Sequence, residues 1–411
     1  MSPRPDSIDY QHGHEWRLGF WLWSPSAFAN LGLITVAGSI YLLRLGFGLE
    51  FIGLQFAVGK IAFGIACLWA PRLGRALTPR QAMRLGLVIV GVFRCMFVVC
   101  ELVPESGRAS FVMLTSAFAN AGLAIYYTNK APYMMGIGSL ESQRRFFSLE
   151  QAYVYASTFL GSLAAGYLPV AFALLLDDSL ATPAPYRYPI VIGGLISILG
   201  AAMLPSLEAA PAASTSTASG EPAEPSSATP IGVMVTMAIA YGLVMTGHNI
   251  SLGFFNAYLD HGLHVSPARN GEISALASLL AAPAALLAPA FTRRWGRSLP
   301  YTLVALAMAV GLAMIGLGRD WTVAAAGFLV LSVAGAIRSP IQNHFYMVAV
   351  APRQRAAMSA AMLIVLQVNG ALVGLAGGLG VDALGYEAVF LVSAAVTAAG
   401  GLMISQHMRS T

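Results

Sequence analysis

The sequence predicts an all-α membrane protein with twelve transmembrane helices, arranged as two six-helix bundles related by pseudo-two-fold symmetry. Three observations predict this fold: the composition, a series of long apolar runs, and a polar stretch that divides the series into equal halves. Hydrophobic residues make up 57% of the 411 residues and charged residues only 10%, whereas about a quarter of residues are charged in soluble domains. A soluble core cannot bury this much apolar surface.

Each apolar run is long enough to cross a bilayer, which takes about 20 residues. Six runs, separated by Gly, Pro or charged residues, fall near 18–43, 48–70, 82–102, 109–131, 146–175 and 188–206. Six more fall near 231–259, 270–292, 299–318, 321–347, 356–380 and 386–407. We therefore expect an N-terminal bundle over 1–207 and a C-terminal bundle over 231–411. Residues 208–230 lack large apolar side chains, which predicts a flexible cytoplasmic linker.

The distribution of Lys and Arg predicts the orientation, because positively charged connections remain on the cytoplasmic side. With the N-terminus inside, most basic residues fall in the inner connections, and the outer ones carry only Arg44, Arg108, Arg187, Arg269 and Arg319. We expect an integral protein of a bacterial inner (plasma) membrane with both termini cytoplasmic. The residues before the first run are polar and that run is too long for a cleaved signal peptide. The net charge of +5 is then a topology signal, and no nucleic-acid partner is expected.

A short basic motif follows corresponding runs in the two halves. It reads Arg-Leu-Gly-Arg over 72–75 and Arg-Trp-Gly-Arg over 294–297. With six plus six spans and a central linker, the chain resembles the major facilitator superfamily over essentially its whole length. The resemblance implies alternating access, a cavity lined mainly by the first, fourth, seventh and tenth spans, and gating by Arg72, Gly74, Arg75, Arg294, Gly296 and Arg297. The acidic residue of the family motif, which latches the cytoplasmic ends, is missing from both loops, where Pro71 and Arg293 stand.

Three basic residues, Lys60, Arg94 and Arg338, stand inside apolar runs with no Asp or Glu at comparable depth. A cation in the bilayer marks either a path for an anion or a helix contact that neutralises it. Arg94 fits a helix contact better, because the third span is peripheral in the family that the chain resembles. The acidic residues nearest to the spans, Glu101, Glu150, Asp260 and Glu272, are expected to be solvated near span boundaries.

The tenth span carries the densest polar stripe, with Arg338, Gln342 and Tyr346 at spacings of four and Asn343 and His344 between them. Arginine can hold a carboxylate or phosphate in a two-pronged fork, although a structural arginine bonded to backbone carbonyls is the other interpretation. Amide, imidazole and phenol side chains on other spans either line the cavity or bridge helices. The candidate substrate-binding residues are Asn30, Lys60, Asn120, Tyr127, His248, Asn249, Asn256, Arg338, Gln342 and Asn343.

The sequence contains no phosphate-binding loop, metal-ligand cluster or nucleophile elbow, so neither an enzyme nor a cofactor is expected. It predicts a secondary active transporter that moves a small organic solute, anionic or amphiphilic, by alternating access. A multidrug or lipophile efflux carrier is the first alternative, and a transport-inactive membrane sensor or scaffold is the second. The expected partners are the substrate, membrane lipid and a coupling proton or ion, and the expected state is a monomer.

Overall fold

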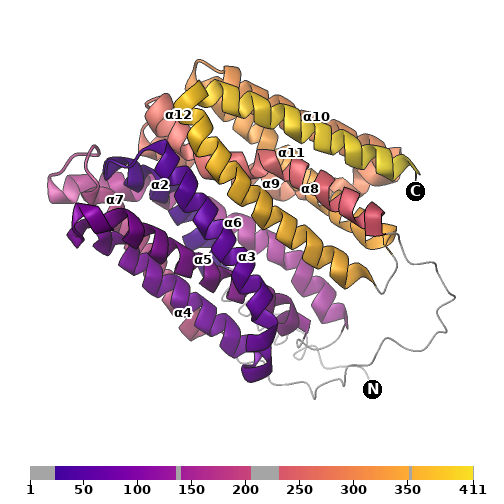
Figure 1. Ribbon diagram of the computed structural model, residues 1–411, viewed down its shortest axis with the longest axis horizontal. Coiled ribbons are helices and arrows are strands. Elements are labelled where there is room, and N and C mark those ends of the chain that lie inside the picture. The colour runs from indigo at the N-terminus through magenta and orange to yellow at the C-terminus, as the bar shows by residue number, and fades with distance from the viewer. Residues whose placement is uncertain (1–23, 136–139, 205–230, 351–353, 411) are drawn as a thin grey trace, which may run out of the picture.

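The computed structural model describes residues 24–135, 140–204, 231–350 and 354–410, and within them the chain forms helices and no strand (Figure 1). The first half contains η1 (Ala27–Leu33), α2 (Ile34–Arg44), α3 (Leu49–Ala76), α4 (Pro79–Phe97), η2 (Val98–Leu102), α5 (Glu105–Met135), α6 (Leu140–Leu176) and α7 (Ala184–Met203). The second half contains α8 (Ile231–Ala257), η3 (Tyr258–Gly262), α9 (Pro267–Trp295), α10 (Ser298–Leu317), α11 (Trp321–Ala349) and α12 (Arg355–Ser410). The predicted linker 208–230 lies outside the described residues.

The helices fall where the apolar runs predict them. In the described part of the chain, 11 helices are long and apolar enough to span a membrane, and the last, Met358–Arg409, has 52 residues. This last helix turns back on itself at Gly385, whose φ of 82° only glycine adopts at little cost (Figure 1). The turn separates the predicted runs 356–380 and 386–407, so the described helices are consistent with twelve passes.

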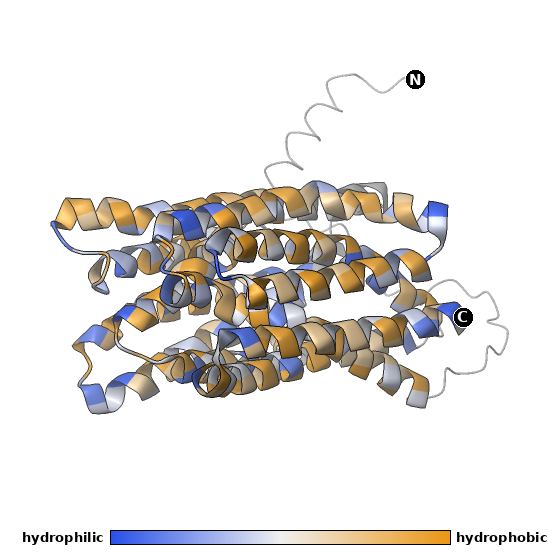
Figure 2. Ribbon diagram, turned by 90° about the horizontal axis from the view of Figure 1, so that it is seen from above, coloured by the Kyte–Doolittle hydropathy of each residue, from blue (hydrophilic) through white to orange (hydrophobic). Residues whose placement is uncertain are grey.

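The outer surface of the bundle is apolar along the helices and polar at their ends (Figure 2). Large side chains such as Leu174, Ile65 and Leu286 are exposed on it. In a soluble protein such a surface would aggregate, whereas in a bilayer it replaces contacts among lipid tails. The chain is therefore an integral membrane protein.

The two halves meet along two seams in which helix backbones touch. A Cβ atom on Gly53 of α3 would overlap the carbonyl oxygen of Gly374 on α12. On the other side of the molecule, a Cβ atom on Gly271 of α9 would lie 2.7 Å from Cα of Gly166 on α6. Glycine permits this approach, and dispersion between the packed backbones holds the helices together.

Both seams lie toward one end of the molecule, which we call the latch end: there α2 and η3 end and α12 turns at Gly385. At the opposite end, which we call the open end, α7 ends, α8 begins and α12 ends (Figure 1). The seams thus join the halves at the latch end.

We predict that Gly53→Val lowers the free energy of unfolding by about 1–3 kcal/mol, because the added methyl groups would overlap the α12 backbone. Gly232→Val is the matched control, since no atom lies within 4 Å of a Cβ at that position, and it should stay within about 0.5 kcal/mol of the wild type. Denaturant unfolding of the purified protein in detergent measures both. Equal losses in the two variants would contradict the tight seam.

Candidate functional site

A cavity of about 420 Å³ lies between the two halves. Its lining comes from η1 and α2, α6, α8, α9 and α11, with one residue each of α10 and α12. The first, seventh and tenth predicted spans thus line it, as the resemblance implies. The fourth span, α5, contributes no described residue to the lining, and the fifth and eighth spans, α6 and α9, take its place.

Arg338 of α11 lies on the lining and is 8% exposed. Its Nη1 donates to Oε1 of Gln342, whose Nε2 donates to the Tyr346 hydroxyl at 2.9 Å. The Tyr346 hydroxyl donates in turn to the carbonyl oxygen of Met237 at 3.4 Å. The polar stripe predicted on this helix is therefore a chain of hydrogen bonds in which Gln342, fully buried itself, orients the guanidinium.

The guanidinium of Arg338 keeps unused donors. Its Nη2 approaches Sδ of Met245 at 3.8 Å, a weak acceptor, and its buried Nε has no partner. Among the residues that the structure describes, Arg338 is the only Lys or Arg on the cavity lining, and no Asp or Glu stands beside it there. Burying a guanidinium without a counter-charge is costly, so this position favours an anion in the cavity.

His248 and Asn256, both predicted, lie on the α8 part of the lining. His248 is exposed to the cavity. The Asn256 Nδ2 donates across the two halves to the carbonyl oxygen of Thr35 at 3.1 Å, and its Oδ1 accepts from the Ser274 hydroxyl at 3.2 Å. Asn256 therefore ties α8 to α2 and α9 at the wall of the cavity.

Three other predicted amides lie outside the described lining and bond within their own half. Asn30 donates to the carbonyl oxygen of Ser26 at 3.3 Å, and Asn120 donates to that of Ser116 at 2.9 Å. Asn249 donates to Oδ1 of Asn369 on α12 at 2.9 Å. These bonds satisfy the amide nitrogens, which would otherwise be costly in hydrocarbon, whereas the buried Oδ1 atoms of Asn30 and Asn249 have no partner in the described part of the chain.

The remaining predicted side chains also lie outside the described lining. The Lys60 ammonium lies 4.9 Å from the centre of the Phe56 ring, and the Lys60 stem packs on Gly370 in the seam between α3 and α12. Tyr127 packs on Phe63 with ring centres 6.5 Å apart. Asn343 is exposed toward the open end.

The two basic motifs are helix ends, where the sequence suggests loops. Arg72, Gly74 and Arg75 belong to the last turns of α3, and their side chains lie outside the described part of the chain. Helix α9 includes Arg294 and stops at Gly296, which has a φ of 73°, and Arg297 precedes α10.

Hydroxyl groups supply most of the polar lining, and sequence reasoning missed them. They belong to Thr35, Tyr155, Thr158, Ser162, Tyr241, Ser251, Ser274, Ser278, Ser332 and Ser339. Spacings of four in Thr158/Ser162 and Ser274/Ser278 were the available signal. That signal is weak, because such hydroxyls commonly bond to their own helix, as Thr158 does to the carbonyl oxygen of Val154 at 2.7 Å.

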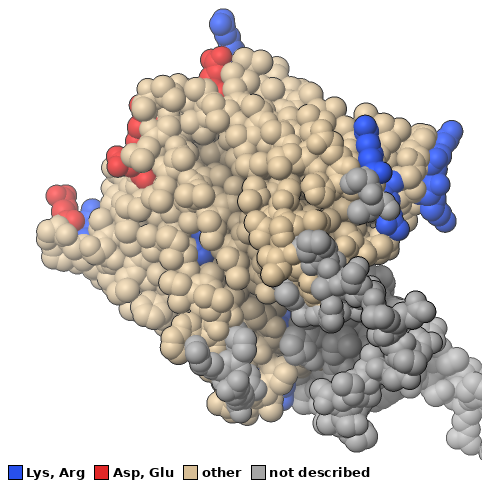
Figure 3. Space-filling view, turned by 45° about the vertical axis from the view of Figure 1, so that its right-hand side comes forward, with Lys and Arg blue, Asp and Glu red and all other residues tan. Residues whose placement is uncertain are grey.

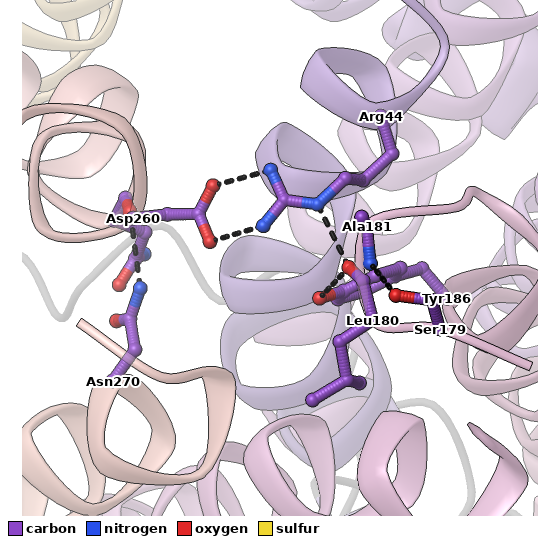
Figure 4. Close-up of polar contacts among 8 residues, drawn as sticks. Arg44, Ser179, Leu180, Ala181, Tyr186, Asp260 and Asn270 are labelled. Carbon is purple, nitrogen blue, oxygen red and sulfur yellow. Dashed lines mark hydrogen bonds and ion pairs between the residues drawn. The ribbon is translucent and has the colours of Figure 1, made fainter. Parts of the chain in front are cut away.

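The expectation that Asp260 is solvated is wrong. Asp260 in η3 is buried, and Arg44 at the end of α2 donates to both of its carboxylate oxygens, at 2.8 and 2.7 Å (Figure 4). The Arg44 Nε donates to the carbonyl oxygen of Leu180 at 2.9 Å, and the guanidinium lies 5.7 Å from the centre of the Tyr186 ring. This two-pronged ion pair joins the halves at the latch end.

Glu101 is also paired, with Arg187 of α7 at 3.0 Å inside the first half. Glu272 accepts a hydrogen bond from the Tyr167 hydroxyl of the other half. The side chain of Glu150 lies outside the described part. Glu101 is therefore partly buried and has a charged partner, whereas Glu272 is exposed, in line with the expectation, and also bonds to Tyr167.

Four polar contacts between the halves lie at the cavity wall and the latch end. Besides Arg44–Asp260, Asn256–Thr35 and Tyr167–Glu272, the backbone N–H of Glu50 donates to Oδ2 of Asp382 at 3.2 Å. The cavity is thus closed on the latch side.

The family model of the Major Facilitator Superfamily matches residues 237–406, which span most of the second half. No curated protein matches the chain in sequence at a significant level.

Solved structures share the fold over both halves. A D-xylose-proton symporter has a TM-score of 0.75 at 13% identity, covering 97% of each chain. The nucleoside transporter NupG has a TM-score of 0.68 at 15% identity, covering 97% of this chain and 99% of that one. A bacterial homologue of the human lysosomal transporter Spinster, in an inward-facing and occupied conformation, has a TM-score of 0.69 at 16% identity, covering 99% of this chain and 97% of that one.

We predict that Arg44→Gln opens the latch end, because it leaves Asp260 buried without a partner, at a cost of about 3–5 kcal/mol. The double variant Arg44→Gln/Asp260→Asn should open the latch end less, since it leaves no buried charge without a partner. The measurement is the rate at which an impermeant maleimide, added from the latch side, labels Ser278→Cys in a background with Cys67, Cys95 and Cys100 replaced by Ala.

Glu101→Gln is the matched control, because it breaks an ion pair within one half and should leave the labelling rate unchanged. If Arg44→Gln labels no faster than this control, the ion pair does not close the latch end.

Proposed function

We propose that this chain is a member of the major facilitator superfamily and a secondary active transporter for a small, hydroxylated organic anion. The observation that carries the proposal is the position of Arg338: a guanidinium with an unpartnered Nε, on a cavity lining whose described residues include no acid. An anion that enters the cavity would supply the missing acceptor and the missing counter-charge together.

The chemistry of the lining supports a polar anion over a lipophilic cation. Arg338 can present its fork to a carboxylate or phosphate, and His248 adds a donor from the facing helix α8. Serine and threonine hydroxyls on α6, α9 and α11 can both donate to and accept from the hydroxyl groups of a solute. A carrier of lipophilic cations would instead favour an acidic residue in the cavity.

The arrangement of the two halves supports alternating access, with the structure in an inward-facing state. Glycine seams and the Arg44–Asp260 pair hold the latch end closed. Basic side chains gather at the open end of the face in Figure 3, and the acidic ones lie toward the other end. Under the positive-inside rule the open end is cytoplasmic, as are both termini.

Transport then requires the latch end to separate as the open end closes around the cavity. No nucleotide-binding motif occurs in the sequence, so the free energy comes from the gradient of the solute itself or of a coupled proton or ion. Asn256 bonds to the Thr35 backbone of the other half. It would lose this hydrogen bond during the movement, which couples the wall of the cavity to the positions of the two halves.

We predict that Arg338→Gln reduces anion exchange by about 30-fold or more, since the loss of one partner of a buried charge pair costs about 2–5 kcal/mol. Counterflow in proteoliposomes measures it, with a panel of labelled sugar acids, phosphate esters, neutral sugars and a lipophilic cationic dye. Arg338→Lys should retain part of the flux, because the charge remains but the fork is lost.

Arg94→Gln is the control, as a second cation embedded in the membrane that does not belong to the described lining. It should keep wild-type flux in correctly folded protein. Flux of the dye alone, unaffected by Arg338→Gln, would favour a multidrug carrier instead. Binding of an anion without any flux would favour a sensor.

A further inference from the structure

A second cavity, separate from the transport cavity, lies on the membrane-facing side of the second half. It is a groove of about 510 Å³ between α9, α10 and α11, and its described lining is entirely apolar. Its residues on α11 include Val333 and Ile337, whereas Ser332 and Ser339 on the same helix line the transport cavity. Leu280 and Leu303 at its edges are exposed, so the groove opens toward lipid.

Exposed arginines stand where the groove reaches the open end. The Arg294 guanidinium lies 5.2 Å from the centre of the ring of Trp295, which itself lines the groove. Arg297 stands between Trp295 and Pro300, the next groove residue along the chain, and together with Arg293 it lines a neighbouring cavity beside His344. Arg293 is exposed one residue before Arg294. No carboxylate pairs with any of these arginines in the part of the chain that the structure describes.

The first turn of α10 adds a third feature at the same place. Arg297 is the N-cap of α10, and no side chain caps this end of the 20-residue helix. The first N–H groups of a helix lack partners within it, and with the helix dipole they attract anions. Arg409 of α12 lies close by, since its Nε donates to the Ser298 hydroxyl at 3.1 Å.

We propose that these features form a binding site for an anionic phospholipid. One acyl chain fills the groove between α9, α10 and α11, and the phosphate lies against Arg294, Arg297 and the first turn of α10. Trp295 lies between the two, as aromatic side chains do at the boundary of hydrocarbon and headgroups. The uncompensated positive charge selects an anionic headgroup over a zwitterionic one. The groove selects a lipid over a soluble phosphate.

Quenching of Trp295 fluorescence tests the proposal in proteoliposomes that contain phosphatidylcholine and either brominated phosphatidylglycerol or brominated phosphatidylcholine. The difference between the wild type and Trp295→Phe isolates the Trp295 signal from the other tryptophans. We expect half-maximal quenching at a mole fraction of phosphatidylglycerol at least about fivefold lower than that of phosphatidylcholine. Each arginine near an anionic lipid contributes about fivefold, so Arg294→Gln/Arg297→Gln should abolish the preference.

Arg319→Gln is the matched control, because Arg319 is an exposed arginine just beyond the other end of α10, and it should keep the preference. Ala307→Trp, which fills the groove, should reduce quenching by both lipids, and anion counterflow by this variant shows that it folds. Equal quenching by the two lipids, or loss of the preference in Arg319→Gln, would overturn the proposal. Displacement of brominated phosphatidylglycerol by millimolar glycerol phosphate would also overturn it and identify a soluble-anion site.

Discussion

The Arg44–Asp260 ion pair combines two constraints that membrane burial imposes on this chain. A carboxylate in a low-dielectric environment needs a counter-charge, and under the proposed alternating access the two bundles need a contact that can be broken. The pair connects the end of α2 with η3, one from each half, at the end where the glycine seams also meet. The position of the cavity, its closed side and its open side all follow from the fact that the halves are joined here.

The cavity differs from the latch end in how its charged groups are paired. At the latch end charges are paired and backbones touch, whereas on the cavity lining a guanidinium is oriented by Gln342 yet keeps an Nε without a partner. Arg94, Arg108 and Arg187 also have a buried Nε without a partner, so this feature alone does not distinguish a binding arginine from a packing one. What distinguishes Arg338 is its place on the cavity lining, where hydroxyl groups surround it and the described residues include no acid.

Much of the fold could be predicted from the sequence, because bilayer thickness and hydropathy determine where helices cross. The break between the last two runs is an example, since it coincides with the turn at Gly385. The site could be predicted only in part. His248, Asn256 and Arg338 are polar enough to be identified in an apolar run, but Ser274 and Ser278 resemble ordinary helix residues. Asp260 was misjudged because its partner, Arg44, is 216 residues away in the sequence, and hydropathy carries no information about such pairs.

The two partners of the ion pair are not equally supported by their own halves. Arg44 also bonds to the Leu180 carbonyl oxygen and lies beside the Tyr186 ring, both in the first half (Figure 4). In the proposed transport movement the Arg44 guanidinium keeps these neighbours. Asp260 instead loses both of its Arg44 donors, and water must replace them. The first half therefore keeps Arg44 oriented for binding when Asp260 is absent. The ion pair can then form again without a prior ordering of the Arg44 side chain.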